Sequence, residues 1–406
     1  MKLFFLCCYL LSSAIVHAQA NNKIVLGAAD SVYSNILKEN RQMWVHVPNN
    51  NSPDGIFAKQ RYPVIYLLDG WGPNFSVVTS IVEQLGGGSG NLAFPKMIVV
   101  GIPNTDRTRD LTPTHIALAP TGMDSMEASR SGGGKKFISF IEKELVPHID
   151  SLYPTAPYRI LIGHSLGGLM SIYTLINHTG LFHAYVAIDP STFWDNQIVL
   201  KQAKEALAKK QFEKTSLFLA TANTMNSGFD TSIIGPIMRC NFQLRDYLNF
   251  YKENKLISGY KYYPDYDHNS VPLPAEYDAL RFVFNFYNYN FPFAEFFNPS
   301  YKSDSLLSEH YKMISRRMGY KVSPPEDFIN GIAYQLMSMN QLDRAHYFFE
   351  MNIENDPGSF NAYDSMGAFF EKKGDKQKAI EFYSKSLSLR ETADTRKKLE
   401  NLKSNK

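Results

Sequence analysis

The sequence predicts an α/β fold with a mostly parallel sheet covered by helices on both faces, followed by a small all-α module. Two observations predict this architecture: apolar, strand-like runs alternate with helical patterns over the first 300 residues, and only helical patterns remain after that point. A third observation is the pentapeptide Gly163–Gly167, of the form Gly-x-Ser-x-Gly, between a strand-like run and an apolar helical run. In parallel sheets of this kind the reactive groups collect at the carboxyl ends of the strands.

The first 20 residues have the features of a signal peptide. A single basic residue, Lys2, precedes an apolar stretch through Val16, and the segment ends in Ala18-Gln19-Ala20, the small-x-small pattern that signal peptidase accepts. A buried first helix is the alternative, but it would need an amphipathic pattern that this segment lacks. We therefore expect an exported protein, periplasmic or secreted, with a sheet domain over residues 21–300 and a helical module over residues 301–406.

Composition excludes several classes of function. The 406 residues carry a net charge of +3 without a long stretch of one sign, and no nucleic-acid-binding motif is present, so we expect no nucleic acid partner. No stretch after the signal peptide approaches the ~18 continuous apolar residues that span a bilayer. Cleavage removes Cys7 and Cys8 and leaves Cys240, which excludes an intramolecular disulfide.

Seven apolar runs between residues 21 and 300 have the length and the β-branched content of buried strands. They are Met43–Val47, Pro63–Leu68, Met97–Ile102, Tyr158–Ile162, Ala184–Ile188, Ser216–Ala220 and Gly259–Tyr263. Helical patterns lie between most of them, most clearly in Lys136–Leu152, where apolar residues recur at helical spacing. The polar segment Thr112–Gly134 has little periodicity, and we interpret it as a flexible flap over the active site.

The pentapeptide predicts a nucleophilic serine, Ser165. The run before it is strand-like and Gly168–Asn177 after it is helical, so the serine occupies a tight strand-to-helix turn. Small residues on both sides allow a strained backbone that projects the hydroxyl above the sheet. This pattern is typical of the nucleophile elbow of an α/β-hydrolase.

A serine hydroxyl needs a base to take its proton, and the base needs a carboxylate to orient it. In this fold the acid and then the histidine follow the serine along the chain. His268 lies in a loop after the last predicted strand, which is where the base belongs. His178 and His183 are better explained as a helix-end residue and a surface residue.

The carboxylate partner is not decided by the sequence. Its usual position, directly at the end of the strand Ser216–Ala220, holds no acid. The first carboxylate in the following loop is Asp230, which is our candidate. Asp265, Asp267 and Glu253 compete with it, and a serine–histidine dyad without a close acid is a further alternative.

The oxyanion hole should combine the amide of Leu166, next to the nucleophile, with an amide from the turn after an early strand. The turn Asp69-Gly70-Trp71-Gly72 predicts the Trp71 amide for this role. The Trp71 side chain either forms a wall of the acyl pocket or is a large core or surface anchor. We also consider Asp69, Arg107 and Arg109 as substrate-binding residues. The two arginines have a second interpretation, in which they order the loop by pairing locally with Asp110.

A repeat of 34 residues is visible in the helical module. Ala345 and Phe349 recur as Ala379 and Tyr383 at this spacing, which, with their small and aromatic character, resembles tetratricopeptide repeats. Two units are visible. Because isolated repeats cannot bury their own faces, we expect them to pack on the sheet domain or on another subunit. They would serve either as a structural cap for the catalytic domain or as a peptide-binding groove for a protein partner.

Six sequence blocks, taken together, resemble a known family. They are YLLDGWG (66–72), VVGIPNTDRTRDLTPTH (99–115), FIEKELVPHID (140–150), GHSLGG (163–168), DPSTFWDN (189–196) and HNSVPLPAEYDALRFVF (268–284). They are similar to the "putative esterase" α/β-hydrolases, which resemble siderophore esterases, feruloyl esterases, S-formylglutathione hydrolase and mycolyltransferases. The resemblance spans about residues 34–290 and implies Ser165 as nucleophile, His268 as base and Trp71 with Leu166 as oxyanion donors. It leaves the acid open.

These observations predict a serine esterase that acts on a small-molecule ester, such as a siderophore-like, feruloyl or acetyl-sugar ester, without a metal or other cofactor. The chain lacks His-Glu-x-x-His and any clustered His/Cys spacing typical of metal sites. Two alternatives remain open: an acyltransferase that uses the same acyl-enzyme, and a non-catalytic binding protein that acts through its helical repeats.

Overall fold

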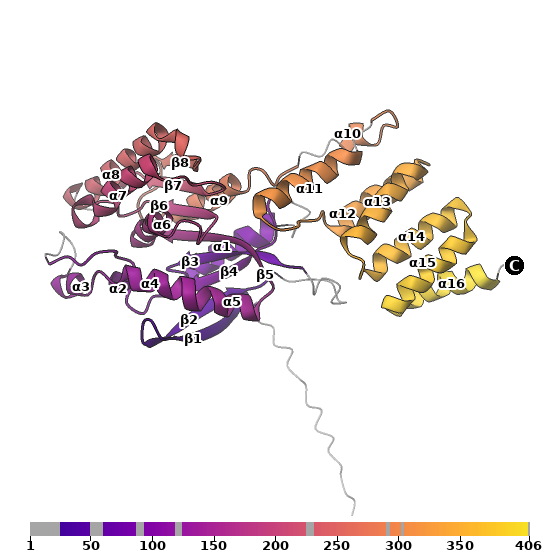
Figure 1. Cartoon of the computed structure of the whole chain (residues 1–406), viewed down its shortest axis with the longest axis horizontal. Helices are drawn as coiled ribbons and strands as arrows, with labels where there is room; N and C mark the ends of the chain where they lie inside the picture. Colours follow the sequence, from indigo (N-terminus) through magenta and orange to yellow (C-terminus); the bar gives the residue numbers. More distant parts are fainter. Residues whose placement is uncertain are drawn as a thin grey trace, which may run out of the picture.

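The structure is a computed structural model that describes residues 25–48, 60–86, 93–117, 124–224, 231–289, 293–301 and 304–404. Two lobes lie side by side along the long axis of the molecule, a sheet domain and a helical module (Figure 1). The expected signal peptide, residues 1–20, lies outside the described residues. Within the part of the chain that is described, every helix is too short or too polar to cross a bilayer.

The sheet has eight strands in the order β1-β2-β4-β3-β5-β6-β7-β8. β2 pairs antiparallel with β1 and β4, and all the other neighbours are parallel. All seven predicted strands are confirmed, and β1 is an additional edge strand that the sequence analysis did not predict. The strands are β1 Ala28–Ser34, β2 Glu39–His46, β3 Tyr62–Leu68, β4 Ile98–Ile102, β5 Thr155–His164, β6 Ala184–Ile188, β7 Ser216–Ala222 and β8 Ile257–Tyr263.

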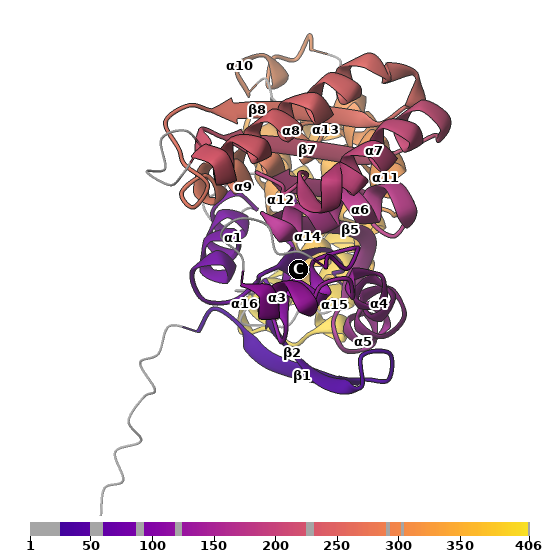
Figure 2. The ribbon, with the colours of Figure 1, turned by 90° about the vertical axis from the view of Figure 1, so that its left-hand side faces the viewer.

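Helices cover both faces of the sheet, as predicted (Figure 2). Side chains alternate along each strand, so that Ile65 and Leu67 of β3 enter one core while Tyr66 and Leu68 enter the other. The helices α1 Gly72–Leu85 and α9 Pro272–Val283 pack into the first core. The second core is filled by α4 Gly134–Phe140, a π-helical turn Ile141–Leu145, α5 Val146–Leu152, α6 Leu166–Asn177, α7 Trp194–Lys209 and α8 Thr231–Phe250.

Two short helices lie in the segment between β4 and α4. They are α2 Arg107–Asp110 and α3 Ser125–Ser129. The second lies in the segment Thr112–Gly134 that we interpreted as a flap, and residues 118–123 of that segment lie outside the described residues. The indole Nε1 of Trp194, at the start of α7, donates to the carbonyl oxygen of Thr114 at 3.3 Å. The described beginning of the segment is therefore tied to the core.

A short helix, α10 Phe293–Phe296, precedes the helical module, which has six described helices. They are α11 Asp304–Met318, α12 Glu326–Ser338, α13 Leu342–Asn355, α14 Phe360–Lys373, α15 Lys376–Leu389 and α16 Ala393–Ser404. Both members of two 34-residue pairs, Ala345 with Ala379 and Phe349 with Tyr383, are fully buried. The repeat therefore has a packing basis in an all-α module, while its assignment to the tetratricopeptide class stays a prediction.

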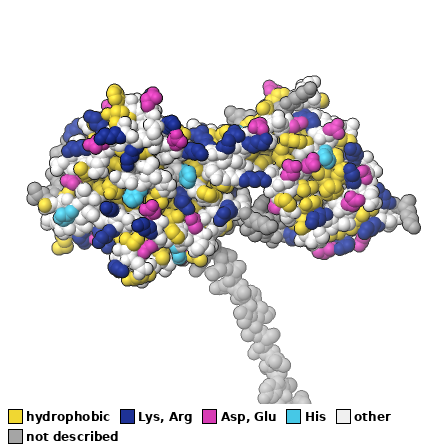
Figure 3. Space-filling model, in the orientation of Figure 1, with side chains coloured by type: hydrophobic (Ala, Val, Ile, Leu, Met, Phe, Trp, Pro, Cys, Tyr) yellow, Lys and Arg dark blue, Asp and Glu magenta, His cyan; other side chains and the backbone are white. Residues whose placement is uncertain are grey.

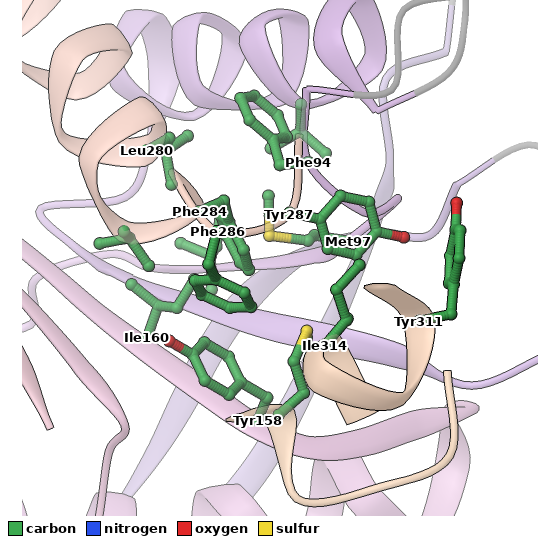
Figure 4. Packing of buried hydrophobic residues seen from close by; sticks show 14 of the residues in the cluster. Phe94, Met97, Tyr158, Ile160, Leu280, Phe284, Phe286, Tyr287, Tyr311 and Ile314 are labelled. Carbon is green, nitrogen blue, oxygen red and sulfur yellow. The ribbon is translucent and has the colours of Figure 1, made fainter. Parts of the chain in front are cut away.

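The helical module docks on the amino-terminal ends of the parallel strands. Figure 4 shows Tyr311 and Ile314 of α11 packed beside Tyr158, near the start of β5, and beside Phe286 and Tyr287 of the segment after α9. Acidic and basic side chains are scattered among hydrophobic and other side chains on the visible face of both lobes (Figure 3). Because β5 rises ~3.3 Å per residue, this contact lies roughly 20 Å from the carboxyl end of the strand.

Candidate active site

Ser165 lies on a strained turn between β5 and α6. Its φ and ψ are 59° and −117°, a left-handed region that side chains other than glycine rarely adopt. The two pentapeptide glycines make the turn sterically accessible, because a Cβ on Gly163 would lie 2.2 Å from the carbonyl oxygen of Gly167. The Ser165 amide donates to the carbonyl oxygen of Ile188 at 3.0 Å, so the turn is fixed to the end of β6.

His268 is held by a buried carboxylate. Its Nδ1 lies 2.6 Å from Oδ2 of Asp189, whose side chain is completely buried. The histidine follows β8 in a loop that Asp267 shapes, because Oδ1 of Asp267 accepts hydrogen bonds from the amides of Asn269 and Ser270. The Ser270 hydroxyl, which donates to the same oxygen at 2.7 Å, lowers the pKa of Asp267 most, and the two amide bonds lower it further. A carboxylate on Nδ1 fixes the histidine tautomer and leaves Nε2 for a second partner.

Asp189 itself is fixed by three further hydrogen bonds. Its own amide donates to the carbonyl oxygen of Ala220 at 2.8 Å, and its Oδ1 accepts from the Ala222 amide at 3.1 Å and from Asn241 Nδ2 at 3.2 Å. The residue comes directly after β6 with a φ of 38°. Its two carboxylate oxygens are thus divided between the protein frame and His268.

Among the described residues, none of the acids that the sequence suggested is hydrogen-bonded to His268. Asp230 lies outside the described residues. Asp265 and Glu253 are exposed, and Asp267 forms the turn before His268. The sequence analysis missed Asp189, although one signal for it was present: it is an aspartate directly after the predicted strand Ala184–Ile188 and between the serine and the histidine in chain order.

The nucleophile region brings two more side chains to Ser165 and His268. Oγ of Ser165 lies 3.3 Å from Oγ of Ser191, and the ring centroids of His164 and His268 are 4.5 Å apart. No direct hydrogen bond joins these described positions of Ser165 and His268, a common situation before substrate binds. Burial, together with the neighbouring His268 and Arg107, lowers the pKa of His164 to about 3. His164 is therefore a neutral neighbour of His268.

The amides of the two predicted oxyanion donors, Leu166 and Trp71, differ in their hydrogen bonding. Leu166 is the first residue of α6, where an amide has no acceptor within its own helix. The Trp71 amide donates to the carbonyl oxygen of Asp69 at 3.0 Å, and the Trp71 side chain is 56% exposed. The turn is pressed against β4, since a Cβ on Gly70 would lie 2.5 Å from the Cα of Gly101. Trp71 can serve an oxyanion only when its bond to Asp69 is released.

Of the three expected substrate-binding residues, Asp69 and Arg107 form an ion pair beside this turn. Nε and Nη2 of Arg107 donate to Oδ1 and Oδ2 of Asp69 at 2.8 and 3.0 Å, and the side-chain Nδ2 of Asn104 also donates to Oδ1. The Arg107 side chain keeps 39% of its surface exposed. This pair orders the turn Asp69–Gly72 and leaves part of the guanidinium open to solvent.

Arg109 belongs to a separate ion-pair network. Its Nη1 and Nη2 donate to Glu39 and its Nε donates to Asp110 at 2.7 Å. Asp110 also accepts from the buried Arg41. Hydrogen bonds from Arg109 lower the pKa of Glu39. These contacts match the interpretation in which Arg109 orders the loop, and they direct its donors toward protein carboxylates.

The chain is similar to proteins that are described as esterases. The model of the family described as "Putative esterase" matches residues 34–226. The ferri-bacillibactin esterase BesA of Bacillus subtilis is 31% identical over 193 residues, which make up 45% of this chain and 65% of that protein. The siderophore enterobactin esterase of Emericella nidulans is 28% identical over 179 residues, 41% of this chain and 58% of that protein. The chain thus spans less than two thirds of the length of these curated relatives.

A solved structure extends the likeness. The IroE-like serine hydrolase from Shewanella oneidensis is 31% identical, with a TM-score of 0.67, and the match covers 81% of this chain and 99% of that one. The similarity therefore includes the sheet domain and part of the helical module.

Proposed function

We propose that this chain, which belongs to the "Putative esterase" family, is a carboxylic ester hydrolase that works through an acyl-enzyme on Ser165. One observation carries the proposal. A serine on a strained elbow lies at the same sheet edge as His268, whose Nδ1 is 2.6 Å from the buried Asp189. A nucleophile, a base and an orienting carboxylate are the groups that acyl transfer requires.

In the proposed acylation step, Oγ of Ser165 attacks the ester carbonyl carbon while Nε2 of His268 takes the hydroxyl proton. Asp189 keeps the Nδ1 proton in place and stabilises the imidazolium that forms. The Leu166 amide donates to the developing oxyanion, and the Trp71 amide joins it after turning from the carbonyl of Asp69. His268 then gives its proton to the leaving alkoxide, and the alcohol departs.

In the proposed deacylation step, His268 takes a proton from a water molecule, and the resulting hydroxide attacks the acyl-enzyme carbonyl. The same two amides stabilise the second oxyanion. His268 returns its proton to Oγ of Ser165 as the carboxylic acid leaves. His164 does not compete as a base, because its low pKa leaves it neutral and a poor proton acceptor near pH 7.

For the substrate we propose siderophore-like esters first, with feruloyl and acetyl-sugar esters as alternatives. The names of the two curated relatives support this order. Two features of the site are compatible with a large polar ester: the Trp71 side chain is exposed beside the oxyanion turn, and Arg107 keeps part of its guanidinium open. An aromatic surface and a guanidinium both suit acyl groups with aromatic rings or anionic oxygens.

We also propose that the protein is exported and that the helical module has a role apart from the chemistry. The signal-peptide pattern of residues 1–20 supports export. The contact of α11 with Tyr158, Phe286 and Tyr287 at the amino ends of the strands supports the second point. A module in that position neither lines nor covers the candidate site, so its cap function would be limited to stabilising the sheet domain.

The test is hydrolysis of short-chain p-nitrophenyl esters by the mature protein beginning at Asn21, with Ser165→Ala as the paired variant. We expect hydrolysis that disappears in Ser165→Ala, followed by a screen of siderophore, feruloyl and acetyl-sugar esters. Added alcohol acceptors separate hydrolysis from acyl transfer. Equal background rates in both proteins, across all these esters, would refute the proposal.

A further inference from the structure

Ser191 is a buried residue at the nucleophile that the mechanism above does not use. It lies two residues after Asp189 in the turn that follows β6, and only 4% of its surface is exposed. Its amide donates to the carbonyl oxygen of Ser165 at 3.0 Å. The elbow and this turn are therefore joined by two backbone bonds, this one and the bond from the Ser165 amide to Ile188.

The Ser191 side chain points at the reacting atom. Its Oγ lies 3.3 Å from Oγ of Ser165, and among the described residues neither hydroxyl has another side-chain or backbone partner. A buried hydroxyl proton without an acceptor costs roughly 1–3 kcal/mol. Because the turn holds Ser191 rigidly, its hydroxyl proton has the Ser165 oxygen as its available acceptor.

The direction of this bond follows from the chemistry. Each hydroxyl has one proton to donate and can accept two. The Ser165 proton must leave toward Nε2 of His268 during acylation, so Ser165 can satisfy both neighbours only if it accepts from Ser191. Negative charge then develops on Oγ of Ser165, and a donated hydrogen bond strengthens as its acceptor becomes charged.

Resting on the proposed esterase function, we propose that Ser191 is a further positioning residue, whose hydroxyl donates to Oγ of Ser165. It orients the nucleophile proton toward His268 and stabilises the charge that develops on the oxygen. One turn, Asp189–Ser191, then supplies both the carboxylate that orients the base and the donor that orients the nucleophile.

The experiment compares Ser191→Ala with Ser171→Ala in the mature full-length protein. Ser171 is a matched control, because it is also a buried serine, and its Oγ donates to the carbonyl oxygen of Gly167 within α6 rather than to Oγ of Ser165. Three quantities are measured: kcat and KM for p-nitrophenyl butyrate, the rate constant for labelling of Ser165 by a fluorophosphonate, and the midpoint of thermal unfolding.

For Ser191→Ala we expect kcat and the labelling rate constant to fall together by roughly 10- to 100-fold, with KM within about twofold of the wild-type value. Its unfolding midpoint should match that of Ser171→Ala, whose kcat stays near wild type. Ser191→Cys, which keeps the volume with a weaker donor, should fall between alanine and serine.

Wild-type kcat and labelling in Ser191→Ala, or in Ser191→Cys if the alanine variant does not fold, would overturn the proposal while leaving the esterase function in place. An equal drop of kcat in Ser191→Ala and Ser171→Ala would also overturn it, since the effect would then be structural. Absence of both hydrolysis and Ser165 labelling in the wild type would instead refute the proposed function, and this inference with it.

Discussion

Replacement of Asp189 by asparagine should nearly abolish catalysis without unfolding the protein. Oδ1 of Asp189 accepts from the Ala222 amide and from Asn241, and Oδ2 accepts from His268 Nδ1. An asparagine has a single oxygen, which will face the two donors of the frame. Its NH2 group then faces Nδ1, so the histidine must carry its proton on Nε2 and cannot take one from Ser165.

The magnitude follows from this tautomer change. Loss of the correct tautomer in a serine–histidine–aspartate site lowers kcat by about 10³- to 10⁴-fold, which corresponds to ~4–5.5 kcal/mol of transition-state stabilisation. The stability cost should stay within about 2 kcal/mol, because the volume is retained and two of the three hydrogen bonds survive. The assay is kcat for p-nitrophenyl butyrate beside the urea unfolding midpoint, for Asp189→Asn and Asp230→Asn.

The comparison with Asp230 is decisive because that residue was the acid expected from the sequence. A near-wild-type kcat in Asp189→Asn together with a 10³-fold loss in Asp230→Asn would refute the role derived from the hydrogen bonds of Asp189. Near-wild-type rates in both variants would favour a serine–histidine dyad.

Three other changes have defined outcomes. Gly163→Ala places a Cβ 2.2 Å from the Gly167 carbonyl oxygen. The free energy of unfolding, measured by thermal unfolding, should therefore fall by more than ~3 kcal/mol, and labelling of Ser165 by a fluorophosphonate should disappear. Burial raises the pKa of Glu276 to about 8, so the folded state favours the protonated side chain. The stabilisation from this proton is complete below the ordinary pKa of glutamate, near 4.5, and is lost as the pH rises toward 8. Urea unfolding at pH 6 and pH 8 should show that Glu276→Gln removes this decline and gains roughly 2–4 kcal/mol over wild type at pH 8. Ile314→Ala should lower the free energy of unfolding by roughly 2–4 kcal/mol in the same assay, because the side chain is fully buried between the lobes. Its kcat should stay within about twofold of wild type, because the contact is distant from Ser165. An unchanged unfolding midpoint or a large loss of kcat would contradict this expectation.

The elements that could be predicted are those whose pattern is local. Seven strands were visible because each is a short apolar run, and the turn at Ser165 was visible because two glycines flank a serine between a strand and a helix. β1 was missed because its sequence, AADSVYS, is polar at an exposed sheet edge and has little apolar alternation. Its place depends on pairing with β2, which the local sequence does not encode.

The parts of the site that escaped prediction depend on the neighbourhood of strands. β6 neighbours β5, which leads into the serine elbow, and lies two strands from β8, whose following loop brings His268 to the residue at the carboxyl end of β6. Asp189 reaches His268 for this reason, although 79 residues separate them in the chain. In this fold the acid usually follows the strand after β6, which is β7, so the prediction was directed there and passed over both Asp189 and Ser191. The order of residues in the chain limits the candidates for the acid, but the order of strands in the sheet decides which candidate lies beside the histidine.

The position of the helical module at the amino ends of the strands has a practical consequence. A linker or a surface attached to α16 would hold the molecule by the lobe beyond the sheet domain (Figure 1). That lobe contacts the amino ends of the strands, whereas Ser165 follows the carboxyl end of β5. Immobilised in this orientation, the protein would present its reaction centre to the bulk solution, and bulky esters would reach it without crossing the support.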